Sequence, residues 1–194
     1  MFSLRKPHER RVREYIDSQS ACDYAYLPHV GATRDDTCPA GFDVDRTRIR
    51  LGEGEATYQL ARTAMFDWQH YGFDWLWLYR PEESCAVGQN VAVVARALGV
   101  WATNVCRVVY VLDETQPVRR SAFAYGTLPG HVELGEERFQ IEWHADDSVW
   151  FEILAFSRPN HILARLAYPY VRRIQRRFGR DATQTLRAVV ARRL

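Results

Sequence analysis

The stretch FQIEWHADDSVWFEILA, residues 139–155, decides the fold of this chain. Two segments of alternating apolar and polar residues flank the turn at 145–147, a pattern typical of an antiparallel hairpin. A three-residue turn places one apolar set on a single side: Phe139, Ile141, Trp143, Val149, Phe151, Ile153 and Ala155. A two-residue turn would bring Glu152 among these side chains, where an unpaired carboxylate is costly. The sequence therefore predicts one register, with Gln140, Glu142, His144 and Glu152 on the opposite side.

Further strands are predicted before this hairpin, and the hairpin itself supplies the last two strands of the series. Runs rich in valine, tyrosine and tryptophan fit a pleated, half-buried surface. Their ranges are 75–79, 91–96, 104–112, 121–128, 132–144 and, after the turn, 148–156. An additional extended segment is predicted over 42–51, and helices over 8–19 and 55–71, the latter with an apolar stripe.

A long amphipathic helix is predicted after Pro159. Its apolar stripe is spaced by three and four residues and consists of Leu163, Leu166, Tyr170, Ile174 and Phe178. We expect Pro169 to kink this helix and Gly179 to break it, with Asp181 capping a second segment.

The order of elements indicates an α+β fold. We expect a curved antiparallel sheet of about seven strands packed on the long C-terminal helix. No linker or repeat divides the sequence, so we interpret residues 1–194 as a single domain. Within it, 1–40 form an N-terminal helix and loop extension, 41–158 the sheet with one inserted helix, and 160–194 the C-terminal helix.

Composition narrows the classes of protein. The chain has 194 residues, 47% of them apolar and 13% aromatic, which is ample for a full core. No apolar run reaches the roughly 20 residues that a membrane helix needs. The N-terminus is charged from its fifth residue and lacks the apolar stretch of a secretory signal, so we expect a cytoplasmic protein without membrane insertion. The four cysteines have no metal-ligand spacing, and we predict neither a metal site nor a cofactor.

Charge is unevenly distributed. Residues 160–194 carry nine arginines and one acid, Asp181, for a local charge of +8, whereas 1–159 carry 17 basic and 23 acidic residues. Such asymmetry can mark a partner surface or a basic helix packed over an acidic sheet. No nucleic-acid motif accompanies the arginines, and nucleic acid is the less favoured partner.

Several segments carry a family resemblance. They are AYGTLPGHVELGEERF at 124–139, NVCRVVYVL at 104–112, AFSRP at 155–159 and QRRF at 175–178. With these segments the chain resembles an uncharacterised family catalogued as domain of unknown function nineteen-ninety. The order of elements is also similar to the helix-grip fold of the START and Bet v 1-like superfamily. That resemblance implies an apolar cavity between sheet and terminal helix, but no catalytic residues.

The sharpest polar grouping is Tyr125, His131 and Glu133. Residues i and i+2 of a strand share a face, so His131 and Glu133 can stand side by side, with Tyr125 on the neighbouring strand. A carboxylate beside an imidazole is suited to acid–base chemistry. The alternative is a turn histidine with solvated glutamates, and both interpretations stay open.

Aromatic side chains and one arginine are candidates for ligand binding. Arg107, within a valine-rich strand, either points into the cavity and binds an anionic group or points outward to a glutamate. The apolar candidates either line a pocket or pack as core. They are Trp75, Trp77, Trp101, Tyr110, Phe123, Trp143 and Phe151.

Three hypotheses for function follow. The first is a module that binds a small apolar or amphipathic molecule between sheet and helix. The second is an enzyme of cyclase, dehydratase or hydrolase type, with Tyr125, His131 and Glu133 as acid, base and orienting group. The third is an interaction protein that uses the arginines of the terminal helix, among them Arg172 and Arg176.

Overall fold

The computed structural model describes residues 1–80, 85–97, 99–116 and 118–194, without the side chains of Ala97 and Leu163. Within these residues, one antiparallel sheet has the strand order β2-β8-β7-β6-β5-β4-β3, and the short β1 pairs with β5. Its strands are β1 (Phe2–Ser3), β2 (Asp43–Glu53), β3 (Leu76–Tyr79), β4 (Asn90–Ala97), β5 (Val100–Glu114), β6 (Arg119–Thr127), β7 (Glu133–Trp143) and β8 (Ser148–Pro159).

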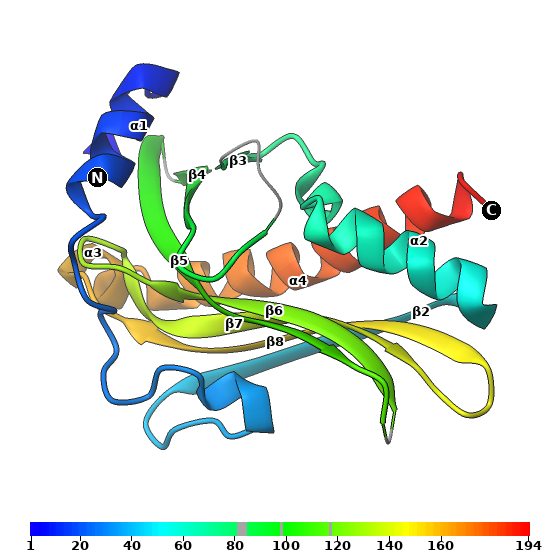
Figure 1. Ribbon diagram of the computed structural model, residues 1–194. Helices are drawn as coiled ribbons and strands as arrows, with labels where there is room; N and C mark the ends of the chain where they lie inside the picture. The colour runs from blue at the N-terminus through cyan, green and yellow to red at the C-terminus, as the bar shows by residue number, and fades with distance from the viewer. Residues whose placement is uncertain (81–84, 98, 117) are drawn as a thin grey trace.

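Two helices cover one face of the curved sheet, as Figure 1 shows. They are α2 (Gly54–Phe66) and the long α4 (Tyr168–Ala191), which follows the short α3 (Ile162–Leu166). We call the face toward these helices the concave face. The remaining helical segments are α1 (Glu9–Ser18), η1 (Ala32–Asp35) and η2 (Gln69–Tyr71). The predicted fold class, a curved antiparallel sheet on a long C-terminal helix, is confirmed.

The hairpin of β7 and β8 has the predicted register. Trp143 is opposite Val149, Ile141 opposite Phe151, and Phe139 opposite Ile153. Gln140 and Glu152 pair on the other face. The side-chain alternation of β7 therefore divides its residues between a helix-covered face and an opposite, convex face.

The terminal helix differs from its prediction in two places. Pro169 lies in the first turn of α4, where its missing N–H costs nothing, so it starts this helix and does not kink it. Gly179 lies inside α4 without breaking it, and Asp181 accepts a hydrogen bond from Trp75 Nε1 (3.0 Å) instead of capping a segment. Leu163 of the predicted stripe has a side chain outside the described ones.

Gly179 sets how closely α4 approaches the sheet. A Cβ atom at this position would lie 2.6 Å from Thr47 Oγ1 on β2. That distance is shorter than a van der Waals contact, so the glycine allows a helix-to-strand contact that any other residue would push apart.

The segment between α1 and β2 covers the convex face of the sheet (Figure 1). Glu136 anchors it, accepting hydrogen bonds from Tyr26 Oη and Gly31 N (both 2.7 Å) and from Thr33 N (3.0 Å). With four donors counting Thr33 Oγ1, this buried carboxylate is well compensated.

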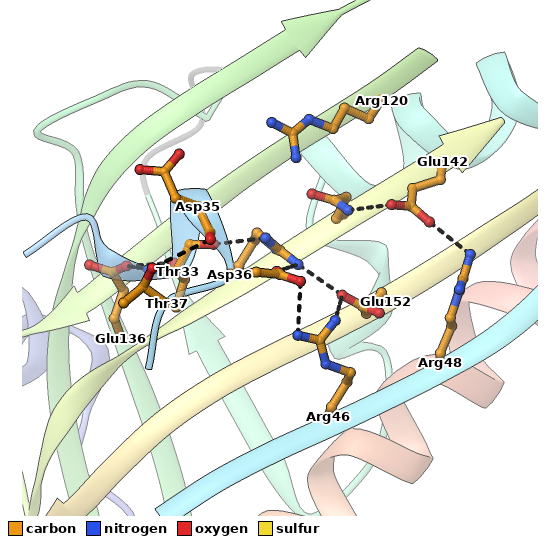
Figure 2. A network of polar contacts seen from close by, with 12 residues as sticks. Thr33, Asp35, Asp36, Thr37, Arg46, Arg48, Arg120, Glu136, Glu142 and Glu152 are labelled. Carbon is orange, nitrogen blue, oxygen red and sulfur yellow. Dashed lines mark hydrogen bonds and ion pairs between the residues drawn. The ribbon is translucent and has the colours of Figure 1, made fainter. Parts of the chain in front are cut away.

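A charged network lies beside this anchor (Figure 2). Arg138, 1% exposed, binds Glu152 (2.8 Å) and Asp36 (2.7 Å). Arg46 joins the same two carboxylates, at 3.0 Å each. Each buried charge has an opposite partner, which is the condition under which buried ions persist.

We predict that Gly179→Ala destabilises the protein by about 1–2 kcal/mol, because overpacking against Thr47 outweighs the roughly 1 kcal/mol gain in helix propensity. Urea denaturation measures the change. In a Thr47→Ala background the same substitution should be neutral or stabilising, because the clashing hydroxyl is gone. Equal stabilisation in both backgrounds would contradict the close contact.

Candidate functional site

A cavity of about 550 Å³ lies between the sheet and the N-terminal half of α4. Its wall includes residues of β2, β4, β5, β6, β7 and β8 on one side and Tyr170, Ile174 and Phe178 of α4 on the other. Two of the residues that border the cavity, Val44 and Arg176, are exposed.

The position of the cavity follows from side-chain size along the strands. Small residues form much of the concave face near α4, including Ala95, Ala102, Gly135 and Ala155. Farther along the same strands the concave positions carry Phe139, Phe123 and Phe151, which α2 covers and which are fully buried. One half of the concave space is thus filled with aromatic rings, and the other half stays open.

A chain of hydroxyl groups ends on a carboxylate in this cavity. Tyr125 Oη donates to Glu137 Oε2 at 2.5 Å, and Tyr71 Oη lies 2.5 Å from Tyr125 Oη. Tyr125 comes from β6, Glu137 from β7 and Tyr71 from η2, and all three line the cavity. The two tyrosines are at most 7% exposed, whereas Glu137 is partly exposed.

Glu137 is the most perturbed carboxylate of the site. Its pKa is raised to about 7, mainly by burial and also by the nearby Asp45 and Glu133 carboxylates, while the Tyr125 hydrogen bond acts in the opposite sense. A group with such a pKa exchanges its proton near neutral pH, and groups of this kind concentrate at functional sites.

Glu133 and Asp45 complete the acidic wall. Gln175 Nε2 on α4 donates to Glu133 Oε2 and, at 2.8 Å, to Ser157 Oγ. Burial raises the pKa of Glu133. Asp45 on β2 accepts hydrogen bonds from the two terminal nitrogens of Arg172, Nη1 and Nη2, with Nη2–Oδ1 at 2.7 Å.

The three predicted catalytic residues line the same cavity, but their contacts differ from the prediction. His131 Nδ1 accepts from the backbone N–H of Glu133 at 2.9 Å, not from its carboxyl group. Burial lowers the pKa of His131 to about 4, so the ring is neutral at pH 7. The carboxylate that binds Tyr125 is Glu137, and the carboxyl group of Glu133 turns to α4.

Arg107 and Trp101 lie on the convex face, because Cys106 and Ala102 beside them take the cavity side of β5. Arg107 donates to the carbonyl oxygens of Gln19 (3.1 Å) and Cys22 (2.8 Å), at the end of α1. The prediction that Arg107 binds an anion in the cavity is therefore wrong, because its guanidinium binds carbonyl groups of the turn that follows α1. Trp101 packs on Trp77, with ring centroids 5.0 Å apart.

Tyr110 is absent from the cavity wall because of a β-bulge. The pairing of β5 with β6 shifts between Val108 and Tyr110, so one extra residue reverses the alternation. Tyr110 therefore lies on the convex face, with its hydroxyl 2.8 Å from Thr33 Oγ1.

The remaining aromatic candidates divide between core and wall. Phe123 and Phe151 face the helices but are fully buried in the packed core, and Trp143 packs near Tyr58 of α2, 6.0 Å between centroids. The expectation that these rings line the pocket is corrected to core packing. Trp75 does border the cavity.

Sequence reasoning missed Tyr71 and gave no chemical role to Glu137, which it placed near His131 and Glu133 as one of the glutamates beyond Gly135. Glu137 stands at the i+4 position from Glu133, with Gly135 between them, on the concave face of β7. Two acids and a glycine at alternate positions, in a strand that continues as Phe139 and Ile141, form the signal that points to this cavity.

The described part of the chain contains neither a metal-binding cluster nor a membrane-spanning helix. No three histidine, cysteine or acidic side chains there gather closely enough to hold a metal ion. None of the helices in those residues is long and apolar enough to cross a membrane.

Comparison with known protein families shows to which family the chain belongs. The model of a family described as "Domain of unknown function (DUF1990)" matches residues 26–185. The chain belongs to this family. A UPF0548 protein of Dictyostelium discoideum is 35% identical over 207 residues, covering 97% of this chain and 96% of the relative. A UPF0548 protein of Deinococcus radiodurans is 35% identical over 201 residues, covering 96% and 97%.

Solved structures of low sequence identity share the fold. The di-domain ARO/CYC StfQ from the steffimycin biosynthetic pathway has a TM-score of 0.54 at 13% identity, covering 77% of this chain and 52% of that one. A hypothetical protein of Helicobacter pylori has a TM-score of 0.53 at 9% identity, covering 86% and 95%. At these identities the similarity establishes the arrangement of sheet and helix alone.

The raised pKa of Glu137 predicts a pH-dependent stability. Between the ordinary glutamate pKa of 4.5 and about 7 the folded protein holds a proton that the unfolded chain releases, so the free energy of unfolding falls as pH rises through this window. A shift of this size corresponds to something on the order of 3 kcal/mol. His131, with its lowered pKa, acts in the opposite sense between about 4 and 6.5.

Comparison with Glu137→Gln isolates the contribution of Glu137. In urea denaturation from pH 5 to pH 8, we expect the wild type to lose roughly 2–3 kcal/mol relative to this variant. Glu142→Gln, on the convex face, is the control and should run parallel to the wild type. Parallel curves for Glu137→Gln as well would contradict the raised pKa.

Proposed function

We propose that this protein binds a small, largely apolar molecule in the cavity between its sheet and α4, with the polar end of that molecule at Tyr125 and Glu137. The observation that carries the proposal is the coincidence of an open cavity with a polar chain, Tyr71–Tyr125–Glu137, at its wall. A cytoplasmic location is part of the same proposal.

The size of the cavity supports it. A volume of about 550 Å³ falls in the roughly 300–1,000 Å³ range of small-molecule pockets. The wall is largely apolar, with contributions from Val93, Ile153, Ile174 and Phe178. Apolar walls with a few convergent polar groups are the usual composition of such sites, in which the apolar surface supplies affinity and the polar groups fix orientation.

The basic face of α4 gives less support to the interaction hypothesis. Arg172 is bound to Asp45, and Arg177 binds Asp181 (3.1 Å) while lying over the Trp75 ring. These arginines hold α4 and its neighbours together, so their charge is partly compensated within the chain.

A large side chain placed in the cavity should weaken the binding of a small molecule. Ala155 faces the cavity beside Glu137, and Ala155→Trp places a large ring in the open space. We expect at least a tenfold loss, about 1.4 kcal/mol, in affinity for the neutral probe N-phenyl-1-naphthylamine, followed by fluorescence. Ala145→Trp, in the exposed β7–β8 turn, is the matched control and should bind as the wild type does. Equal binding by Ala155→Trp, or none by the wild type, would refute the proposal.

A second candidate function is acid–base catalysis on the bound molecule. The observation that favours it is the Glu137 carboxyl group, with its pKa of about 7, hydrogen-bonded to Tyr125 inside the cavity. A base with a pKa near the working pH is the efficient choice for moving a proton to or from carbon.

Deuterium exchange tests this second candidate. With 4-phenyl-2-butanone in D₂O at pH 7, Glu137 would remove a proton from the carbon next to the carbonyl group and return a deuteron from solvent. We expect protein-dependent deuterium incorporation, measured by mass spectrometry, that falls by roughly 100-fold in Glu137→Gln. Incorporation at the rate without protein would remove this candidate, and the binding proposal would remain.

A further inference from the structure

We propose that the cavity accepts an organic cation: a small, largely apolar molecule whose amine or quaternary ammonium group lies against the Glu137 carboxylate. The inference rests on the proposed binding function and adds the charge of the ligand. It also reverses the expectation of an anionic group, which depended on Arg107 facing the cavity.

Three carboxylates of the sheet other than Glu137 are compensated within the chain, and the buried Glu133 accepts a hydrogen bond from the Gln175 amide. Glu152 binds Arg138 and Arg46, and Asp45 binds Arg172. Glu136 has four hydrogen-bond donors from the N-terminal segment. Glu152, Asp45 and Glu136 thus each meet either a cation or a full set of donors.

Glu137 has neither. Its one partner among the described residues is the neutral hydroxyl of Tyr125, which occupies Oε2. Among the described residues no hydrogen bond reaches Oε1, and the partly exposed side chain lines the cavity, so a molecule that enters can contact this carboxylate. A carboxylate removed from water without a cation is unfavourable, and a ligand that brings a positive charge relieves that cost.

The charges around Glu137 favour the same ligand. Glu133 and Asp45 both act on Glu137 as like charges, although Asp45 is itself ion-paired with Arg172. The arginines that border the cavity, Arg46 and Arg176, are exposed. Negative charge thus acts on Glu137, which has no cationic partner among the described residues, and this favours an entering cation over an anion.

Aromatic rings add a second attraction for a cation. Tyr71, Tyr125 and Phe178 border the cavity near the carboxylate, and the Tyr71 and Phe178 rings lie 5.3 Å apart. Ring faces attract ammonium groups by roughly 0.5–2 kcal/mol, most strongly where water is excluded. A carboxylate beside such rings discriminates an ammonium group from both a neutral and an anionic one.

A charge series with one apolar body tests the proposal. The three probes are 4-phenylbutyl-trimethylammonium, 4-phenyl-1-butanol and 4-phenylbutyrate, each displacing N-phenyl-1-naphthylamine at pH 7.5. In the wild type we expect the cation to bind about tenfold more tightly than the alcohol, and the anion most weakly. In Glu137→Gln the cation and the alcohol should bind within about threefold of each other, with the alcohol little changed. Glu142→Gln is the control and should keep the wild-type order.

A second measurement uses only the wild-type protein, so its result does not depend on whether Glu137→Gln folds. The affinity of the permanently charged probe should rise with pH through about 7, as Glu137 ionises, while that of the alcohol stays level. The other titratable or charged groups that face this wall are Tyr71, Tyr125, Cys106, Asp45, Glu133, His131, Arg172 and Arg176.

The outcomes separate this inference from the proposed function. If no probe binds the wild type, the binding function itself fails. If the probes bind but the alcohol or the anion equals the cation, only the inference of a cationic ligand is overturned. The same holds if the preference for the cation survives in Glu137→Gln or if its affinity does not depend on pH.

Discussion

The structure depends on the alternation of side chains along β7. Glu136 and Glu137 are neighbours in sequence, yet they face opposite sides of the sheet and meet opposite surroundings. Glu136 fixes the N-terminal segment to the convex face, and Glu137 stands in the cavity. A shift of the register by one residue would exchange them, burying Phe139 and Ile141 on the wrong face as well. Fold and site therefore rest on the same pairing of β7 with β8.

The open cavity is a consequence of how the concave face is divided. Where α2 covers the sheet, Phe123, Phe139 and Phe151 fill the space. Where the first half of α4 covers the sheet, the alanine and glycine residues of the strands are too small to fill the space. The Gly179–Thr47 contact holds α4 close to β2 at the border of this region, so the helix roofs the cavity without collapsing into it. Packing thus produces both the rigid half and the open half of one interior.

Much of the fold follows from local patterns in the sequence. The β7–β8 register was predictable because only one turn length keeps Glu152 away from the aromatic face. The site was less predictable, because its geometry depends on features without a periodic signal. A bulge at Val109 turned Tyr110 to the convex face, and a close contact with Thr47 kept Gly179 inside a continuous helix. Arg107 takes the convex side of β5 by alternation with Cys106, and its partners there are carbonyl groups about 85 residues away in sequence, which its own strand does not indicate.

The contrast between satisfied and unsatisfied carboxylates separates structural polar groups from functional ones. Arg138 and Glu152 are nearly inaccessible and each is paired with an opposite charge, so their interaction serves the fold. Glu137 has the opposite arrangement, a carboxylate on the cavity wall with one neutral hydrogen-bond donor among the described residues. In most proteins, local sequence preferences, packing and the pairing of polar groups all favour the same structure. Exceptions to this agreement concentrate at functional sites. The raised pKa of Glu137 reflects such a departure: burial disfavours its charged form, and in the proposed function a bound ligand supplies the missing partner.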